Sequence, residues 1–444
     1  MHAEGLESPI IECAIWAAVR RVFGVVDRVP SARYVWLPLG SLLVPVTVAA
    51  RRRCAAGVVW SWMRVLVTST PGTGHLHPLV PLARELVAAG HEVVWATAAS
   101  SCGKVTDFGF RAASSGLDPD VRRTMLLDRL AHVRDLPPRE RRAVQLPIVF
   151  GEVTAPAMRD DLIDVYSVVK PDLVIHEFAE LAAAPMAKAR GIPCVCVGFS
   201  NAISDSVQTA VEASVAPVWE LEGLQVSTET LNGDLLLHPF PAHLDTPRSD
   251  VPSAPMRPMS FDGASLTSPP EWADSFGKDR PGVYVTFGTE MSPRAPWAAL
   301  FEALSELDVD VVATVGSQLD PALLGPSGPN IRVEQYVPQS FVIDRADVVV
   351  SHAGAGTVIG AATAGAVQLC IPIAADQWDN ADLLSDANVG VVLEPEERDA
   401  DTIRLSTQRL LVDETMRSSA EVLCDHFASM PHPSQIAASI DQLV

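Results

Sequence analysis

Two stretches of the chain alternate short apolar runs with helical segments, and this alternation leaves few folds open. The first stretch begins with the apolar run 64–69, continues through a glycine-rich turn into a helical pattern that ends at Gly90, and returns to an apolar run at 91–98. A strand, a helix and a strand in this order are typical of a parallel sheet, because parallel strands need a long crossover connection. Two further apolar runs, 172–176 and 193–198, extend the pattern. We therefore expect an α/β domain with a parallel sheet.

The alternation restarts after Pro281. The second stretch holds further apolar runs that are candidate strands, at 283–287, 309–315, 331–336, 348–351, 367–373 and 389–393. The intervening residues 239–281 are rich in proline and poor in apolar runs, which is typical of a linker. The sequence thus predicts two doubly wound, Rossmann-like domains, 63–238 and 282–432, that face a cleft. Ligands of such sheets bind beyond the carboxyl ends of the strands.

Residues 1–62 differ in composition from the rest. They carry seven arginines, no lysine and four of the nine tryptophans of the chain. The apolar run 34–50 is short for a membrane span and is interrupted by two prolines, and the arginines at 51–53 follow it where a signal peptide needs small residues. Met63 directly precedes the first strand of the α/β pattern. We expect an over-extended reading frame whose natural start is Met63, with a membrane anchor or an accessory segment as alternatives.

The overall charge restricts the classes of partner. The net charge is −21, so the surface repels nucleic-acid phosphates and anionic lipid, which argues against nucleic-acid and membrane-surface roles. The seven cysteines show no metal-ligand spacing. Cys194 and Cys196 share one face of a predicted strand, and we expect both to be reduced core residues of a cytoplasmic protein. An anionic ligand must then be held by a local arrangement of donors.

One glycine turn offers such donors. The segment Ser351–Thr357 reads SHAGAGT, follows a buried strand and precedes a helical pattern. Gly354 and Gly356 let the backbone approach a ligand, and the amides at the start of the helix can bind a diphosphate. His352 and the Thr357 hydroxyl could donate to the same phosphate oxygens. Taken by itself, however, such a turn is equally typical of any tight junction between a strand and a helix.

The loop after the next strand adds a second set of polar groups. Asp376 and Gln377 follow an apolar run and offer the carboxylate and the amide that bind sugar hydroxyls. With this loop in place, the chain from about Met63 to its end resembles family 1 glycosyltransferases of the bacterial natural-product type. That group glycosylates macrolides and related antibiotics.

Five segments of the second domain carry the resemblance. The family's H-G-G-x-G-T turn is matched by His352, Gly354, Gly356 and Thr357, with Ala353 in place of a glycine. Its G-x-P-Q segment is matched by Gly365 and Gln368, and its D-Q-x-x-N-A loop is complete in Asp376, Gln377, Asn380 and Ala381. The resemblance also implies that the donor is bound by Gly288 and Thr289 of a first loop, and by Val337 and Gln339 of a V-P-Q segment near the base.

The first domain supplies the catalytic candidates. Gly74–Pro78 resembles the family's G-H-x-x-P, in which the histidine removes the proton of the acceptor hydroxyl, so His75 is the implied base. Histidine suits this role because it titrates near neutral pH and is oriented by a carboxylate on its other nitrogen. The segment 171–177 matches the P-D-L-V-x-H-[DE] context of that carboxylate, which makes Glu177 the candidate. His176 and Glu180 remain alternative partners.

The resemblance implies a GT-B fold and an inverting glycosyltransferase. Its donor would be a TDP- or UDP-linked sugar, its acceptor a small hydrophobic natural product, and neither a metal nor another cofactor would be required. Residues 433–444 would form a helix that crosses back to the first domain, and an activator protein or a homodimer is left open. A sugar-nucleotide epimerase on the same fold and a non-catalytic nucleotide-sugar-binding partner are the rival hypotheses. The first turn lacks the G-x-G-x-x-G spacing of a dinucleotide-dependent dehydrogenase.

Overall fold

The computed structural model describes residues 33–39, 42–48, 52–53, 59–60, 62–226, 231–245, 252–261, 269–325 and 327–443. The chain divides into two units, 1–62 and 63–444. In the first unit, β1 (Arg33–Leu39) pairs antiparallel with β2 (Leu42–Val48), and β3 (Arg52–Arg53) with β4 (Val59–Trp60). Residues 1–32 of the predicted extension lie outside the described residues. The account below concerns the second unit.

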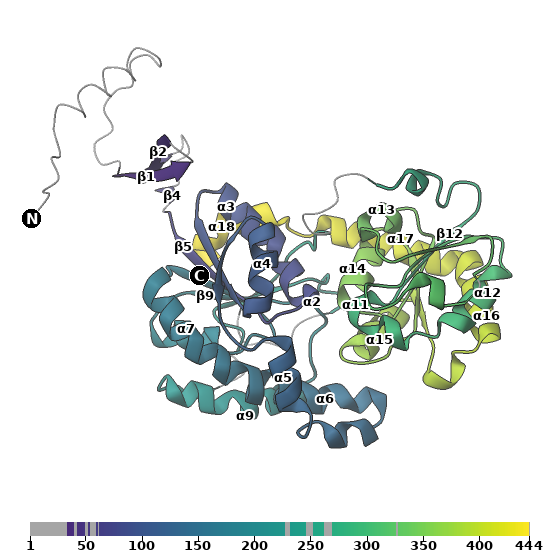
Figure 1. Cartoon of the computed structure of the whole chain (residues 1–444), viewed down its shortest axis with the longest axis horizontal. Helices are drawn as coiled ribbons and strands as arrows, with labels where there is room; N and C mark the ends of the chain where they lie inside the picture. The colour runs from purple at the N-terminus through teal and green to yellow at the C-terminus, as the bar shows by residue number, and fades with distance from the viewer. Residues whose placement is uncertain are drawn as a thin grey trace, which may run out of the picture. The chain divides into compact units, whose positions relative to one another are not determined.

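The first half of this unit is built on one parallel sheet, drawn from purple to teal in Figure 1. Its strands lie in the order β11-β10-β9-β8-β5-β6-β7, and every described pair is parallel. The strands are β5 (Arg64–Thr68), β6 (Glu92–Thr97), β7 (Arg111–Ser114), β8 (Leu173–Glu177), β9 (Cys194–Val197), β10 (Leu235–His238) and β11 (Ser253–Pro255). Because β5 lies between β8 and β6, the chain reverses its direction of winding there and leaves a crevice at the carboxyl ends of the strands.

Helices cover both faces of this sheet because the strands bury side chains on both. In β5, Val65 and Val67 belong to one apolar cluster, while Leu66 belongs to the cluster on the opposite face. Cys194 and Cys196 are free and buried, as predicted. The main helices are α2 (Thr73–Leu76), α3 (Val80–Ala88), α4 (Ala99–Asp107), α5 (Pro119–Leu126), α6 (Arg141–Leu146), α7 (Ala155–Val169), α8 (Ala183–Ala189) and α9 (Asp205–Leu221). A π-helical segment, η4 (Pro147–Thr154), joins α6 to α7.

The prediction that residues 239–281 form a linker is partly wrong. Its residues Ser253–Pro255 form β11, which pairs in parallel with β10 and adds an edge strand to the first sheet. The first domain therefore extends beyond residue 238. The proline content hid this strand, because proline cannot donate to a sheet ladder and is tolerated only at an edge.

The second half repeats the architecture. Its parallel strands lie in the order β14-β13-β12-β15-β16-β17. They are β12 (Gly282–Thr286), β13 (Asp310–Thr314), β14 (Ile331–Glu334), β15 (Val348–Ser351), β16 (Val367–Cys370) and β17 (Gly390–Val392). The helices are α11 (Gly288–Met291), α12 (Trp297–Ser305), α13 (Gln339–Ile343), α14 (Ala355–Thr363), α15 (Gln377–Asp386), α16 (Ala400–Val412) and α17 (Glu414–Ser429). The predicted fold class, two doubly wound parallel α/β domains, is confirmed.

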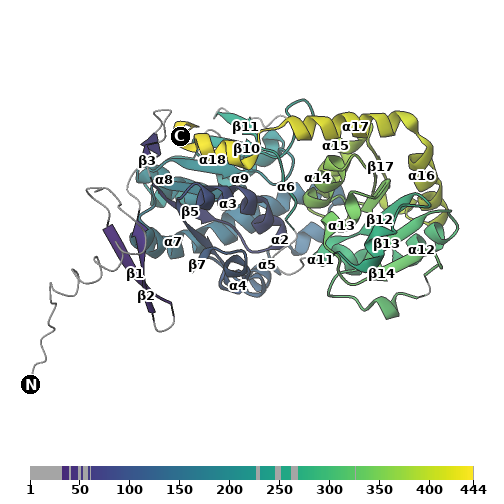
Figure 2. The same cartoon turned by 90° about the horizontal axis from the view of Figure 1, so that it is seen from above.

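The last helix, α18 (Pro433–Leu443), returns to the first domain. Ile436, Ala437 and Ile440 are buried in the apolar cluster of that domain, and Figure 2 shows α18 along α3. Burying three apolar side chains contributes several kcal/mol at roughly 25 cal/mol per Å². The C-terminal helix thus packs against the first domain. None of the helices among the described residues is long and apolar enough to cross a membrane.

Candidate active site

His75 and Glu177 meet at the carboxyl edge of the first sheet. His75 lies in α2, which follows β5, and Glu177 is the last residue of β8, the strand paired with β5. Because neighbouring parallel strands end at the same edge, residues 102 positions apart in sequence come into contact: His75 Nδ1 lies 3.2 Å from Glu177 Oε1. Glu177 is fully buried, whereas 21% of the His75 side chain stays exposed. The pair therefore offers one imidazole nitrogen held by a carboxylate and the other available to a ligand.

The Glu177 carboxylate is held in its ionised form. Burial alone would raise its pKa, but the neighbouring His75 and several hydrogen bonds outweigh burial and lower the pKa of Glu177. The Thr70 amide donates to Oε1 at 3.1 Å, the Thr70 hydroxyl donates to it at 2.7 Å, and the Ala179 amide donates to Oε2 at 2.5 Å. A carboxylate fixed by donors on both oxygens is well suited to orient an imidazole.

The two alternative partners of His75 have other contacts. Glu180 accepts from the Thr68 hydroxyl at 2.6 Å and from the Ala182 amide at 2.8 Å, at the start of α8. Burial raises the pKa of Glu180 to about 7, against the effect of these hydrogen bonds. His176 is fully buried, and its Nδ1 contacts the carbonyl oxygens of Glu177 and Glu180. Neither side chain is placed against His75.

A cavity of about 470 Å³ opens beside His75. Most of its lining is apolar and comes from the first domain, chiefly Leu146, Val149, Phe150, Phe199, Val211 and Leu231. Phe150 and Phe199 flank the His75 ring, with centroids 5.7 and 4.8 Å away. The second domain contributes Met291 and Asp376 to the same cavity. A small apolar molecule bound there would touch the imidazole and groups of both domains.

Most donor candidates of the second domain follow the carboxyl ends of β12, β15 and β16. These strands are neighbours in the second sheet, so the residues after them lie at the same edge. The His352 ring lies between two glycine positions: a Cβ on Gly354 would approach His352 Nε2 to 2.5 Å, and one on Gly288 would approach the ring to 3.3 Å. The ring therefore leaves no room for a Cβ at Gly354, and the φ of +64° favours glycine at position 288. Burial lowers the pKa of His352 to about 4, although Asp376 and a backbone hydrogen bond with Thr286 oppose this. At neutral pH the ring acts as an uncharged hydrogen-bonding group.

Ala353 occupies the position where the resembling family has glycine. Its φ is +61°, in the left-handed region, so the alanine adopts the backbone conformation that glycine favours. Left-handed backbone costs a non-glycine residue roughly 1–2 kcal/mol, but the Ala353 methyl group is fully buried in the core of the second domain and recovers about 0.8 kcal/mol. The Asn380 side chain donates to the Ala353 carbonyl at 3.0 Å and holds the turn.

We expect Ala353→Gly to change the denaturation temperature little, because relief of backbone strain is offset by loss of the buried methyl group and by the greater entropy of glycine in the unfolded chain. Ala353→Val should lower it by several degrees, since a β-branched residue is strained at this φ. Thermal unfolding of the two variants beside the wild type measures both effects. A valine variant as stable as the wild type would show that the turn does not adopt the left-handed conformation.

Helix α14 begins directly after this turn, with Gly354 as its N-cap residue. Gly356 is exposed, and a Cβ added there would meet no atom within 4 Å, so there is open space beside the first turn of the helix. Thr357 lies one residue further and is 9% exposed. The start of α14 can therefore receive an anion without displacing protein atoms.

Asp376 and Gln377 have different surroundings. Gln377 Oε1 accepts from the amides of Ile373 and Ala374 at 2.7 and 2.8 Å, so this side chain shapes the loop in which Asp376 lies. Asp376 Oδ2 accepts from Asn380 Nδ2 at 3.1 Å and from the Ser200 hydroxyl at 2.5 Å. Asp376 thus faces the cavity beside His75, and Gln377 lies behind it.

The remaining donor candidates, Val337, Gln339 and Thr289, do not line the cavity. Val337 is buried in an apolar cluster, so it can offer a ligand only its backbone. Gln339 begins α13 and lies against α14, near Gly360. Thr289 lies in α11, and its carbonyl accepts from Gln318 at 3.0 Å. In the part of the chain that the structure describes, no group of three His, Cys, Asp or Glu side chains could hold a metal ion.

Two site residues were missed by the sequence analysis. Ser200 follows β9 and contacts Asp376 of the other domain, and Arg142 of α6 lines the cavity. Polar residues directly after the predicted strand 193–198 were a signal for Ser200, since ligands gather at that edge. Arg142 gave no signal, because it lies in a stretch of broken helix whose position over the cleft depends on tertiary packing.

Comparison with protein families identifies relatives over almost the whole second unit. The family described as erythromycin biosynthesis protein CIII-like matches through its N-terminal domain at residues 84–288 and through its C-terminal domain at residues 298–443. Neither match reaches residues 1–62. The first match begins after β5 and extends through β12, and the second match contains the remaining strands of the second sheet, β13 to β17.

Individual relatives have the same extent. The chain is 31% identical to L-demethylnoviosyl transferase of Streptomyces niveus, over 85% of this chain and 97% of that protein. It is 28% identical to tylactone mycaminosyltransferase of Streptomyces fradiae, over 86% and 92%. The crystal structure of the glycosyltransferase SsfS6 of Streptomyces sp. SF2575, complexed with thymidine diphosphate, is similar with a TM-score of 0.70 and 27% identity, over 86% of this chain and 99% of that one.

Proposed function

Since the chain belongs to the erythromycin biosynthesis protein CIII-like family of glycosyltransferases, we propose that it transfers a sugar from thymidine diphosphate to a hydroxyl of a small, largely apolar natural product, in the cytoplasm and with inversion. The protein is a glycosyltransferase; the nucleotide, the acceptor class and the stereochemistry are the proposal. Thymidine diphosphate is favoured because the solved relative SsfS6 holds it. The relatives are named as transferases, which supports transfer over the rival epimerase and over a non-catalytic role.

The observation that carries the proposal is the His75–Glu177 pair at the wall of an apolar cavity that Asp376 also lines. If neutral His75 carries its proton on Nδ1, which lies 3.2 Å from Glu177 Oε1, it keeps a lone pair on Nε2. That nitrogen accepts the proton of the acceptor hydroxyl, while the hydroxyl oxygen attacks the anomeric carbon. The bond from this carbon to the diphosphate breaks, and thymidine diphosphate leaves with the electron pair from the opposite face. Configuration at the anomeric carbon therefore inverts.

The departing diphosphate gains negative charge, which the second domain is suited to stabilise. The amides at the start of α14 and the Thr357 hydroxyl can donate to its oxygens, and His352 can join them on gaining a second proton, because the one N–H of its neutral ring is taken by the Thr286 backbone. We propose that these donors stabilise the leaving diphosphate without a divalent cation. Gly288, Thr289, Val337 and Gln339 would contact the rest of the nucleotide through backbone and side-chain groups.

A binding experiment tests the donor site. Calorimetry with TDP-glucose, TDP-rhamnose, UDP-glucose and GDP-mannose, each with EDTA present, should give the highest affinity for a TDP-sugar. Gly356→Ala should fold at least as well as the wild type, because alanine is the better helix former by about 1 kcal/mol and its Cβ has open space. Donor affinity should nevertheless fall by about tenfold or more, because the Cβ occupies the space where the diphosphate approaches the helix.

Acceptor-dependent release of TDP, measured in the same buffer, then separates a transferase from a donor-binding partner. Gly103→Ala, in helix α4 of the first domain, also places a Cβ in open space, so it is the matched control and should leave donor affinity unchanged. Undiminished donor binding by Gly356→Ala would place the diphosphate elsewhere. A strict requirement for magnesium would contradict the metal-free stabilisation of the leaving group.

A further inference from the structure

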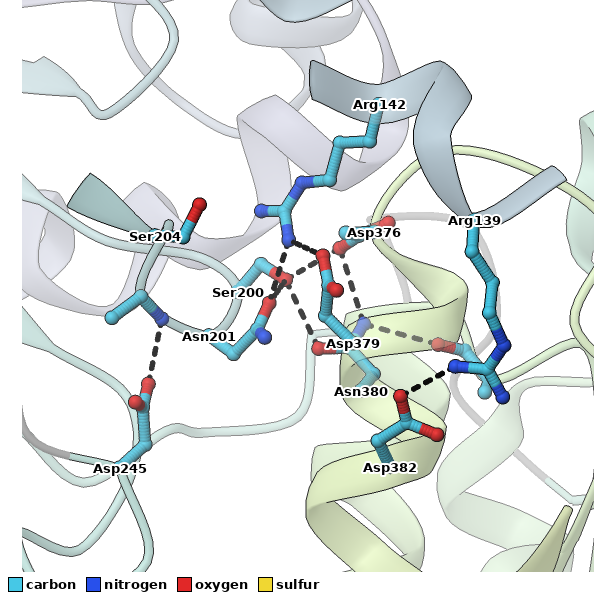
Figure 3. Close-up of polar contacts among 12 residues, drawn as sticks. Arg139, Arg142, Ser200, Asn201, Ser204, Asp245, Asp376, Asp379, Asn380 and Asp382 are labelled. Atoms are coloured by element: carbon cyan, nitrogen blue, oxygen red, sulfur yellow. Dashed lines mark hydrogen bonds and ion pairs between the residues drawn. The ribbon is translucent and has the colours of Figure 1, made fainter. Parts of the chain in front are cut away.

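Ser200 of the first domain contacts the polar loop of the second. Its hydroxyl lies 2.5 Å from Asp376 Oδ2 and 3.1 Å from Asn380 Oδ1 (Figure 3). One hydroxyl has a single proton to donate, and the shorter contact to a charged oxygen takes it. The Ser200 hydrogen bond therefore goes to the Asp376 carboxylate. Asp376 and Ser200 both line the cavity beside His75.

The two oxygens of Asp376 have different surroundings. Oδ2 receives hydrogen bonds from two domains: one from Ser200 and one, at 3.1 Å, from Asn380 Nδ2. Asn380 is itself fixed, since the same nitrogen donates to the Ala353 carbonyl at 3.0 Å. Among the described residues, no hydrogen bond to Oδ1 is formed by the protein. Two donors thus orient the carboxylate, and its second oxygen stays available for a ligand hydroxyl.

Arg142 holds the loop that carries Ser200. Its guanidinium donates to Asn201 Oδ1 at 3.2 Å and forms an ion pair with Asp379 of α15, as Figure 3 shows. The Arg142 side chain is 12% exposed and that of Asp379 is 47% exposed, so solvent screens this ion pair from the Asp379 side only. The neighbouring Arg139 pairs with Asp382 and Glu394, but these side chains are more than 40% exposed. Arg142 therefore links the Ser200 loop and the Asp376 loop most directly.

We propose that Ser200 is a positioning residue of the donor-sugar subsite: it orients the Asp376 carboxylate so that Oδ1 accepts a hydroxyl of the transferred sugar. The subsite for the sugar is then completed by the acceptor-side domain, and it is formed only while the two domains are in contact through Ser200 and Arg142. The diphosphate and the nucleobase of the donor are held by the second domain alone. This inference rests on the proposed function, because it requires a nucleotide-sugar donor.

The test compares a donor with and without its sugar. Calorimetry uses thymidine diphosphate and the tightest-binding TDP-sugar of the panel above. Ser200→Ala should weaken binding of the TDP-sugar by about tenfold, the loss of a hydrogen bond to a charged group, and leave binding of thymidine diphosphate unchanged. Ser200→Thr keeps the hydroxyl and should restore most of the affinity. Ser204→Ala is the matched control, because Ser204 is exposed, contacts Ser206 at 3.1 Å and lies away from Asp376 in Figure 3.

A double-mutant cycle distinguishes positioning from a direct contact. If Ser200 acts through the carboxylate, Ser200→Ala should have no further effect on TDP-sugar affinity in an Asp376→Ala background. Equal weakening of thymidine diphosphate and TDP-sugar by Ser200→Ala would overturn the inference, as would additive effects of the two substitutions. Wild-type protein that binds no thymidine diphosphate at all would contradict the proposed function itself, and this inference with it.

Discussion

Replacing His75 by alanine should lower turnover of the native acceptor by roughly 10²–10⁴-fold, the contribution of a positioned general base. The reason is local: His75 is the imidazole at the wall of the apolar cavity, and its Nδ1 lies 3.2 Å from Glu177 Oε1. Removing the ring removes proton transfer from the acceptor hydroxyl. It does not alter the His352–Thr357 turn, which lies in the other domain, so donor affinity should stay nearly constant.

Steady-state kinetics of the wild type and the variant provides the decisive measurement: kcat should fall in His75→Ala, while the KM for the donor stays close to the wild-type value. The matched control is His432→Ala: His432 lies before α18, contacts Ser434 and does not line the cavity. Near-native turnover by His75→Ala would contradict the mechanism and would indicate either another base or an acceptor acidic enough to need none.

Glu177→Gln should lower turnover by about 10²-fold, toward the lower end of the contribution of a positioned base. Neither orientation of the new amide suits the site. If the amide nitrogen takes the place of Oε2, it lies where the Ala179 amide donates to Glu177 at 2.5 Å, and two hydrogen-bond donors then face each other. With nitrogen in place of Oε1, it faces the Thr70 amide and donates to His75 Nδ1. That contact puts the imidazole proton on Nε2, where the acceptor's proton must go.

Binding and kinetics together check the Glu177 prediction. The kcat should fall while donor affinity stays constant, and the loss of a buried hydrogen bond should lower stability by about 1–3 kcal/mol. Asp172→Asn is a matched control, because this carboxylate stands at the opposite end of the same strand segment and pairs with Arg64 near the surface. A Glu177→Gln enzyme with native kcat would show that the carboxylate has only a structural role.

Much of the architecture could be predicted because a parallel sheet buried on both faces requires continuous apolar runs. The run 348–351 coincides with β15, and the run 64–69 with β5 but for its last residue. The strands that were missed are short and lie at or near an edge of the sheet. β7 carries the polar residues Arg111 and Ser114, and β11 ends on a proline. Edge strands are exposed on one side, so selection for apolar residues is weak there.

The choice of partner for His75 depended on tertiary structure. Three titratable side chains, His176, Glu177 and Glu180, lie within five residues of one another, and spacing alone does not rank them. Their contacts in the folded chain distinguish them. Glu180 accepts hydrogen bonds from Thr68 and from the start of α8, and His176 contacts backbone carbonyl oxygens. Of the three, only Glu177 contacts His75. The contacts of a side chain at the end of a strand depend on the residues that follow the adjacent strand, and those residues are distant in sequence.

The sequence by itself determined the two sheets, the glycine turn of the second domain and the histidine at the end of the first strand, because each depends on residues close together along the chain. Only the tertiary structure decided that Ser200 meets Asp376 and that Arg142 reaches Asp379, across 176 and 237 positions. It also showed that Gln377 supports the loop while Asp376 faces the cavity. Contacts between domains are set by how two separately folded surfaces pack, and no local pattern of residues records that packing.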